Sequence, residues 1–421
     1  MRLFKHCTAI IAFLVLFVQC KPQATHGQSL EGESHQNTNK VSLDKASFEM
    51  GRFLGNKGII SNLRLLKLQN SAAYKRYATT SKVLMQKFKQ SNAYTMKKWI
   101  NKNLEKKPIE TLFYPFSGPD ILNALIFFPQ AKNILMAALE PTGKLPNVQD
   151  EPPTQVAKGL HFLTYALNEI LGLNFFRTND MKVEIGSTQF NAVTPILMFF
   201  IVKSGYDIVK VQNVTLSNQG KLVIYQGSKP NKKFNGSQIF YVPFGKKPTR
   251  GNIRNVVFFS GDISDDAMKK RAAWLKFIES YGKVTTFLKA ASYLMYRSQF
   301  DDVRSLILAH SEKIFFESSG FPFHHLTSNK SLWNIKLYGR YTRPIHLFRM
   351  RCQPDLVKAI RKETLGVLPF SFGYNYKKGY SHIIIADRKP NKFITQPKYD
   401  HTSKKGIETY CSGGRLIVEK K

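Results

Sequence analysis

The chain has 421 residues, 43% of them hydrophobic, which is enough for two or three ordinary domains with packed cores. Its 63 lysines and arginines outnumber its 28 acidic residues, and the net charge of +35 favours anionic partners. Beyond the N-terminal segment, no stretch approaches the roughly 20 apolar residues of a membrane span, which argues against a membrane-spanning body.

The first 20 residues have the pattern of a secretory signal peptide. Basic residues at positions 2 and 5 precede an apolar run over 9–18, and the chain then turns abruptly polar. The segment 1–20 therefore predicts an exported protein.

Cys20 lies where this signal ends. The segment resembles the signal of a bacterial lipoprotein, in which the cysteine becomes the acylated first residue, although Gln19 stands where such signals have a small residue. The resemblance implies lipidation of Cys20 and an anchor to a bacterial membrane at the cell envelope. The alternative is an ordinary signal peptide that is cut a few residues later, near Ala24 or Gly27.

The segments that follow are polar and then basic. Residues 21–51 contain few bulky apolar side chains, which predicts a flexible tether. Residues 52–107 have apolar residues at helical spacing and a basic residue every few positions, which predicts amphipathic helices with a basic face. Such a face could bind an anionic membrane surface or envelope polymer, or it could simply keep the domain solvated. The lysines expected to contribute most are Lys97, Lys98, Lys102, Lys106 and Lys107.

The stretch 113–120, Phe-Tyr-Pro-Phe-Ser-Gly-Pro-Asp, is the centre of the first predicted unit. Apolar runs precede and follow it, so the pattern over 109–140 predicts a strand, a tight loop, a short helix and a second strand. Gly118 is free to adopt a turn conformation, Pro119 suits the first turn of a helix, and Asp120 suits the positive helix end.

Further elements follow in chain order. The pattern predicts a helix over 156–171, an apolar segment over 194–202 that is either helix or strand, a hairpin over 208–225 and a strand over 238–244. The Lys/Pro/Gly-rich stretch 245–251 is the predicted boundary between an N-terminal half, 52–248, and a C-terminal half, 249–390.

The second half begins with a block that resembles the first. Residues 258–263 share Phe-Ser-Gly and then Asp-Ile with residues 116–121, which indicates either a degenerate duplication or chance similarity. The later predicted elements are a helix from Ser264 or Asp265 to Tyr281, helices over 284–296 and 300–310, a hairpin over 368–387 and a loosely ordered basic tail over 391–421. The predicted fold class is α/β or α+β, with a mixed sheet, helices and two degenerate Rossmann-like halves as one possibility.

Residues 113–120 and the run 289–295, Lys-Ala-Ala-Ser-Tyr-Leu-Met, together resemble a group of bacterial exported proteins of unassigned function. The resemblance covers residues 109–390 and implies an envelope protein with a mixed α/β body. It implies no activity.

The first unit also allows a nucleotide-binding hypothesis. In dinucleotide- and S-adenosylmethionine-binding folds a glycine loop follows the first strand and an acid ends the second strand, and Gly118 and Glu140 occupy these places. The fingerprint G-x-G-x-x-G is absent, however, and Pro115 and Pro119 remove amide donors that a phosphate would need. A purely structural loop is therefore the favoured alternative, and no cofactor is predicted. The candidate ligand-binding residues are Ser117, Gly118, Asp120 and Glu140.

No catalytic, metal-binding or nucleic-acid-binding motif accompanies these residues. Two functions therefore stay open. One is a tethered envelope protein that binds or organises anionic material, with a small ligand as an additional partner. The other is an envelope hydrolase or transferase with its site near Asp120 and Glu140. The sequence does not decide whether Cys352 and Cys411 form a disulfide or remain separate thiols.

Overall fold

The structure of the protein, a computed structural model, describes residues 41–105, 107–173, 189–190, 192–225, 235–328, 331–374, 379–390, 392, 407–412 and 415–420. The predicted signal peptide, Cys20, Lys106 and most of the predicted tether lie outside these residues. Within the described part of the chain, no helix combines the length and the apolar character needed to cross a membrane.

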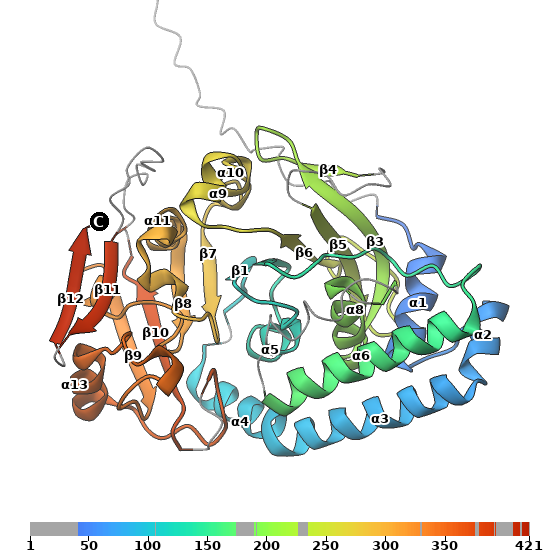
Figure 1. Ribbon diagram of the computed structural model, residues 1–421, viewed down its shortest axis with the longest axis horizontal. Coiled ribbons are helices and arrows are strands. Elements are labelled where there is room, and N and C mark those ends of the chain that lie inside the picture. The colour runs from blue at the N-terminus through green and yellow to red at the C-terminus, as the bar shows by residue number, and fades with distance from the viewer. Residues whose placement is uncertain are drawn as a thin grey trace, which may run out of the picture. The chain divides into compact units, whose positions relative to one another are not determined.

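A mixed sheet of ten strands runs through the described residues in the order β4-β3-β5-β6-β2-β1-β7-β8-β10-β9 (Figure 1). The central strands β6, β2, β1, β7 and β8 are parallel, and antiparallel strands extend the sheet on both sides. The predicted α/β class is confirmed. The strands are β1 (Thr111–Pro115), β2 (Asn133–Ala138), β3 (Tyr206–Leu216), β4 (Leu222–Ile224), β5 (Asn235–Pro243), β6 (Arg254–Ser260), β7 (Val284–Leu288), β8 (Ser311–Phe316), β9 (Trp333–Gly339) and β10 (His382–Arg388).

Helices precede and connect the strands. The α-helices are α1 (Lys45–Gly55), α2 (Leu63–Gln69), α3 (Ala72–Phe88), α4 (Tyr94–Asn103), α5 (Ile121–Phe127), α6 (Pro153–Leu173), α8 (Val193–Lys203), α9 (Asp265–Lys269), α10 (Ala273–Glu279), α11 (Asp301–His310), α12 (His324–Thr327) and α13 (Pro354–Glu363). A π-helix, η2 (Lys89–Ala93), joins α3 to α4, and the short 3-10 turns are η3 (Leu294–Tyr296), η4 (Ser298–Phe300) and η5 (His346–Phe348).

The sheet is the middle layer between two apolar cores. In β1, Leu112 and Tyr114 belong to a core shared with helices α1 to α6 and α8, whereas Phe113 belongs to a core shared with α9 to α13. Successive side chains of a strand point to opposite faces, so a strand covered on both faces is apolar throughout. This is why 109–140 reads as continuous apolar runs, and the predicted β-loop-α-β unit is confirmed as β1, α5 and β2.

Several other predictions are confirmed. The helix predicted over 156–171 is α6, the undecided segment over 194–202 is the buried helix α8, and the hairpin predicted over 208–225 is formed by β3 and β4. The helix predicted from residue 264 or 265 to Tyr281 exists as two shorter helices, α9 and α10.

The helix predicted over 284–296 is wrong, because its first part is the strand β7. Val284, Thr285 and Thr286 are β-branched residues, which fit a strand, and β7 pairs in parallel with both β1 and β8. The run 289–295 after β7 contains residues common in helices, such as alanine and leucine, but Ala290, Ser292 and Tyr293 take left-handed φ values instead, as described below.

The hairpin predicted over 368–387 is also wrong. The second strand exists as β10, but its partners are β8 and β9. The segment before it contributes Phe370 and Phe372 to the buried aromatic group around Phe127 instead of extending as a strand. Burial of these rings outweighs the local strand preference of the segment.

Both ends of the folded region differ from the prediction. The helix α1 begins at Lys45, inside the predicted tether, and Asp44 caps it by accepting a hydrogen bond from the amide of Ser47 at 2.7 Å. The predicted loose tail contains an antiparallel hairpin, β11 (Ile407–Ser412) and β12 (Arg415–Lys420). A disulfide joins Cys352 to Cys411 in β11, and it settles the pairing that the sequence leaves open.

The two predicted halves contribute strands to one sheet. The boundary 245–251 is the connection between β5 and β6, which are hydrogen-bonded neighbours, and β1 pairs with β7 of the other half. The described residues all belong to one compact unit. The similar blocks at 116–121 and 258–263 both lie where a parallel strand leads towards a helix, but their geometry differs. Gly118 has a positive φ and Asp120 caps α5, whereas the second block begins inside β6 and Ser264 is the N-cap of α9.

We expect His382 to make the fold sensitive to acid. Its imidazole is fully buried at the start of β10, and Nε2 accepts a hydrogen bond from the amide of Ser318 at 2.8 Å. Burial lowers the pKa of His382 from 6.5 to about 3, so the folded protein holds the neutral ring where the unfolded chain binds a proton. This contribution to stability is complete above pH 6.5 and is lost as the pH falls towards 3.

The measurement is urea unfolding of the wild type and His382→Gln at several pH values between about 7 and 4, the window set by linkage. The glutamine keeps an acceptor but does not titrate, so the wild type should lose more stability than the variant across this window. Parallel pH profiles for the two proteins would contradict a neutral buried His382.

Candidate functional site

The five parallel strands have the order of a doubly wound sheet. Numbered along the chain, β1, β2, β6, β7 and β8 are the first to the fifth parallel strand, and their order in the sheet is 3-2-1-4-5. Successive parallel strands are added on one side of β1 up to β6, and then on the other side from β7 onwards, so the switch point lies between β1 and β7. In such sheets ligands bind outside the carboxyl ends of the strands at this switch point, so the fold itself indicates where a site belongs.

A cavity of about 150 Å³ lies at this position. Residues of β1 and β2, and residues directly after the ends of β6 and β7, line this cavity. Its apolar wall is formed by Phe116, Ile263, Leu294 and Phe300, among others. Its carboxylates are Asp120, Glu140 and Asp262, and Lys289 contributes the ammonium group. Carboxylates therefore outnumber cations in a cavity of a strongly basic protein.

All four residues predicted as ligand-binding candidates line this cavity: Ser117, Gly118, Asp120 and Glu140. The turn after β6 supplies Gly261, Asp262 and Ile263, so the two similar sequence blocks meet at one site. Sequence reasoning missed the third contribution, residues 289–292, because it predicted a helix there. The run of β-branched residues in β7 was the available signal.

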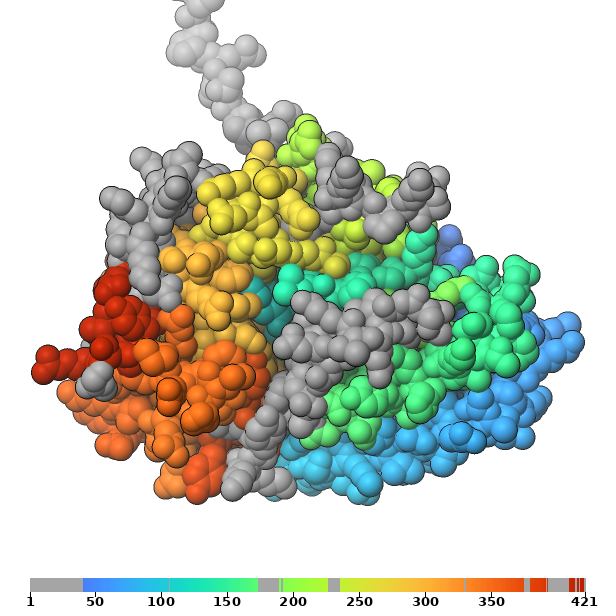
Figure 2. Space-filling view, viewed as in Figure 1, coloured from blue at the N-terminus to red at the C-terminus, as the bar shows by residue number. Residues whose placement is uncertain are grey.

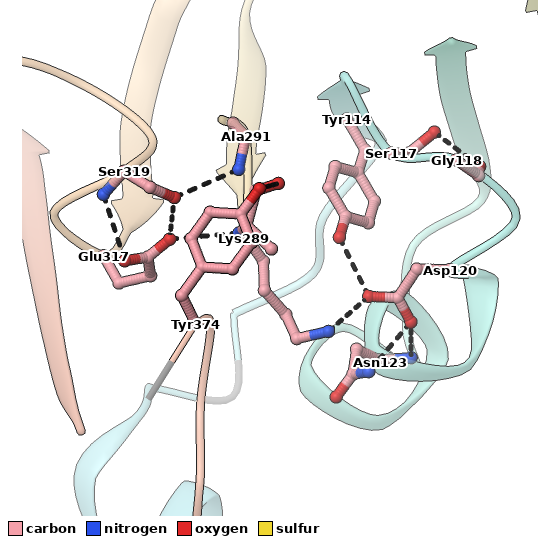
Figure 3. Close-up of polar contacts among 11 residues, drawn as sticks. Tyr114, Ser117, Gly118, Asp120, Asn123, Lys289, Ala291, Glu317, Ser319 and Tyr374 are labelled. Carbon is pink, nitrogen blue, oxygen red and sulfur yellow. Dashed lines mark hydrogen bonds and ion pairs between the residues drawn. The ribbon is translucent and has the colours of Figure 1, made fainter. Parts of the chain in front are cut away.

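Asp120 is the most heavily bonded of these groups (Figure 3). Its Oδ2 lies 2.7 Å from Nζ of Lys289 and accepts a hydrogen bond from the hydroxyl of Tyr114 at 2.9 Å. Its Oδ1 accepts from the amide and the side-chain nitrogen of Asn123 at 3.3 and 2.8 Å. The side chains of Lys289 and Asp120 are only 0% and 4% exposed, so this is a buried ion pair.

Burial raises the pKa of the Tyr114 hydroxyl well above its ordinary value, and the neighbouring Asp120 carboxylate raises it further. The phenol therefore stays protonated and acts as a hydrogen-bond donor to Asp120. These partners fix the position of the Asp120 carboxylate. We therefore assign Asp120 a structural role, which is to hold the loop at the wall of the cavity.

The loop before α5 is tight and internally bonded. Gly118 has a positive φ of 52°, as expected for a residue where the strand turns sharply. The hydroxyl of Ser117 donates to the carbonyl of Gly118 at 3.0 Å, and the Ser117 amide donates to the Ala137 carbonyl at 3.1 Å. Asp120 is the N-cap of α5, so Pro119 precedes the helix and does not lie in its first turn as predicted.

Strained backbone gathers around the cavity. Among the described non-glycine residues, those with positive φ are Asn56, Phe116 (58°), Ala290 (51°), Ser292 (53°) and Tyr293 (54°). Phe116, Ala290 and Ser292 line the cavity. Such conformations cost on the order of 1–3 kcal/mol each and concentrate at functional sites.

Glu317 is hydrogen-bonded to the strained segment that follows β7 (Figure 3). Its carboxylate is buried after β8 and accepts hydrogen bonds from the amides of Ala290 and Ser319, each at 3.0 Å, and from the Ser319 hydroxyl. Burial raises the pKa of Glu317. On the other side, the hydroxyl of Tyr374 donates to the Ala290 carbonyl at 3.0 Å. The cavity wall at 290–292 is thus held from two directions.

Among the described residues, no cluster of three or more histidine, cysteine, aspartate or glutamate side chains could hold a metal ion. No protein-family model and no curated protein matches the chain. The resemblance to exported bacterial proteins therefore remains a prediction, and any function must be argued from the site itself.

We expect Lys289→Met to destabilise the protein by about 3–5 kcal/mol, because it leaves the carboxylate of Asp120 buried without its counter-ion. Asp120→Asn combined with Lys289→Met removes both charges and should recover a large part of this loss. The free energies of unfolding are measured by urea denaturation.

Lys132→Met is the matched control, because Lys132 forms an ion pair with Glu110 in which both side chains are more than half exposed. Such a surface pair contributes about 0–1 kcal/mol, so the control should melt nearly as the wild type does. If Lys289→Met cost no more than Lys132→Met, the buried pair would not support the site.

Proposed function

We propose that the protein binds a nucleoside-containing ligand of the S-adenosylmethionine type in the switch-point cavity and acts as a group transferase. The observation that carries the proposal is the position of Glu140, which follows β2 at the cavity, is 4% exposed, and comes about 20 residues after the first strand–helix loop. An acid at this place binds the ribose hydroxyls in nucleotide-binding doubly wound folds.

The strands beyond the parallel region support the same proposal. The last strand of the sheet along the chain, β10, is inserted antiparallel between β8 and β9. If the parallel strands keep the numbers 1 to 5 and β9 and β10 become 6 and 7, the order from β6 to β9 is 3-2-1-4-5-7-6. This arrangement is typical of S-adenosylmethionine-dependent methyltransferases. Shared topology raises the expectation of a related ligand, and the residues of the cavity must carry the rest.

The chemistry of the cavity favours a ligand without phosphate. A dinucleotide places its pyrophosphate on free amides at a helix N-terminus, but here the carboxylate of Asp120 already caps α5, and Pro115 and Pro119 reduce the donors of the loop. Repulsion from Glu140 and Asp262 further opposes an anion. A cationic sulfonium with a neutral ribose suits these carboxylates better.

Each part of the lining has a task in this proposal. Glu140 accepts from the ribose hydroxyls, Ile263 and Phe116 supply apolar contact for a base, and the Asp120–Lys289 pair holds the loop that faces the ligand. When bound, such a ligand supplies an activated methyl group. At about 150 Å³ the cavity is smaller than the 300–1,000 Å³ of a site that encloses a drug-sized ligand, so only part of the ligand would be enclosed.

We expect Glu140→Gln to weaken binding of S-adenosylmethionine and S-adenosylhomocysteine by about tenfold or more, the usual effect of losing a hydrogen bond to a charged group. Binding is measured by isothermal titration calorimetry, with NAD as a phosphate-bearing comparison that should not bind. Glu110→Gln is the control, because Glu110 is an exposed glutamate that precedes β1 at the opposite end of the strand.

Absence of binding by both adenosyl ligands would contradict the proposal. Equal affinity of the wild type and Glu140→Gln would contradict the role given to Glu140. Tighter binding of NAD than of S-adenosylmethionine would show that the cavity accepts a phosphate.

As an alternative to the adenosyl ligand, which is made in the cytosol, we propose that the protein is exported and acts at the cell envelope, anchored through Cys20, towards an anionic membrane surface or envelope polymer. Two observations support this second role. Every lysine and arginine between residues 72 and 103, along α3, η2 and α4, is exposed, and that span contains no acidic residue. The Cys352–Cys411 disulfide suits an oxidising compartment.

The anchor is tested by growing cells with a labelled fatty acid. The wild type and Cys7→Ala should carry the label, whereas Cys20→Ala should not, because only Cys20 lies at the end of the signal. Cys7→Ala is a matched control within the same segment. Label on Cys20→Ala, or none on the wild type, would contradict the lipid anchor.

A further inference from the structure

A second cavity, of about 310 Å³, lies among α3, η2, α4, α5 and the end of α8. It shares no lining residue with the switch-point cavity. Its apolar lining is formed by Met85, Phe88, Ala93, Leu122, Leu125 and Ile126. Most of these side chains belong to the main core, so the base of the cavity is a fixed apolar surface.

Lysines supply all the charge of this second cavity. Its lining contains Lys57, Lys89, Lys97 and Lys203, and none of the described residues that line it is acidic. The amines of Lys57 and Lys203 lie over aromatic rings, 4.2 Å from the centre of Phe244 and 5.6 Å from the centre of Phe199. The cavity therefore combines an apolar base with a rim of positive charge.

The environment of Lys203 shows that these charges repel one another. Burial, together with repulsion from Lys89, Lys57 and Lys82, lowers the pKa of Lys203 to about 8. A bound anion would relieve this repulsion and favour the charged amine, so the site gains more from an anion than a set of separated surface lysines would.

The wall of the cavity includes an unusual turn. Between α3 and α4 the chain forms the π-helix η2, which supplies Lys89 and Ala93 to the lining. Short π-helical turns inside α-helices are rare and occur frequently at functional sites. The same helices form an open part of the surface, drawn in blue along the lower edge in Figure 2, where their other lysines can attract anions.

We propose that this cavity binds an acidic phospholipid, with the phosphate head group on the lysine rim and the first carbons of an acyl chain on the apolar base. A free phosphate shares only the head-group chemistry, and a long polyanion would use the exposed lysines without needing the apolar base. The site is independent of the switch-point cavity. It adds a specific ligand to the proposed envelope role, and its test in solution does not depend on export or on Cys20.

The test compares three soluble probes by calorimetry at physiological salt: dihexanoyl phosphatidic acid, dihexanoyl phosphatidylcholine and inorganic phosphate. Phosphatidic acid should bind at least about tenfold more tightly than phosphate, because its chains bury apolar area as well. Phosphatidylcholine, whose head group has no net charge, should bind weakest. Equal binding of the two lipids, or phosphate as tight as phosphatidic acid, would overturn the proposal.

Lys203→Gln should weaken binding of phosphatidic acid by about tenfold, through the loss of one charge-assisted contact. Lys75→Gln is the matched control, because Lys75 is an exposed lysine of α3 that does not line the cavity, and it should bind within about twofold of the wild type. Equal weakening by the two variants would show general attraction to a basic surface and would contradict a specific site.

Thermal melting separates binding from folding. Lys203→Gln removes an amine that neighbouring lysines repel, so the variant should melt no lower than the wild type. Loss of binding with an unchanged melt supports the site, whereas unchanged binding by Lys203→Gln overturns it.

Discussion

The buried ion pair between Asp120 and Lys289 is the interaction on which the site depends. It joins the turn after the first parallel strand to the end of the fourth, where the two halves of a doubly wound sheet diverge. Both side chains are almost completely buried, so water does not solvate either charge and each is stabilised by the other. The same carboxylate caps α5 and orders Tyr114 and Asn123, and it thereby fixes one wall of the cavity.

This arrangement also underlies the ligand that we propose for the cavity. The carboxylate of Asp120 occupies the position where a nucleotide fold would place a phosphate, and Glu140 and Asp262 add negative charge nearby. The cavity among α3, η2, α4, α5 and α8 has the opposite character, with lysines and no acid in its described lining. The net charge of +35 therefore does not predict the charge of the switch-point cavity, because the charged side chains nearest to a ligand decide the potential that it meets.

Much of the first half could be predicted from periodicity and turn chemistry. The β1-α5-β2 unit, α6 and the β3–β4 hairpin have apolar patterns that agree with their surroundings, and Gly118 has the conformation that its turn requires. The prediction failed at β7 and at 368–374, where local preference and tertiary environment disagree. Pairing with β1 and β8 makes 284–288 a strand, and burial of Phe370 and Phe372 makes their segment a loop.

The sequence by itself determined the local elements of the site: the tight turn at Gly118, the capping acid at Asp120 and the acid at Glu140. These depend on neighbours a few residues away, and such short-range rules can be read along the chain. Only the tertiary structure decided that Lys289, 169 residues distant, pairs with Asp120, and that the turn after β6 lines the same cavity. The physical reason is that strand order in the sheet, set by packing on both faces, brings together side chains whose separation along the chain carries no signal.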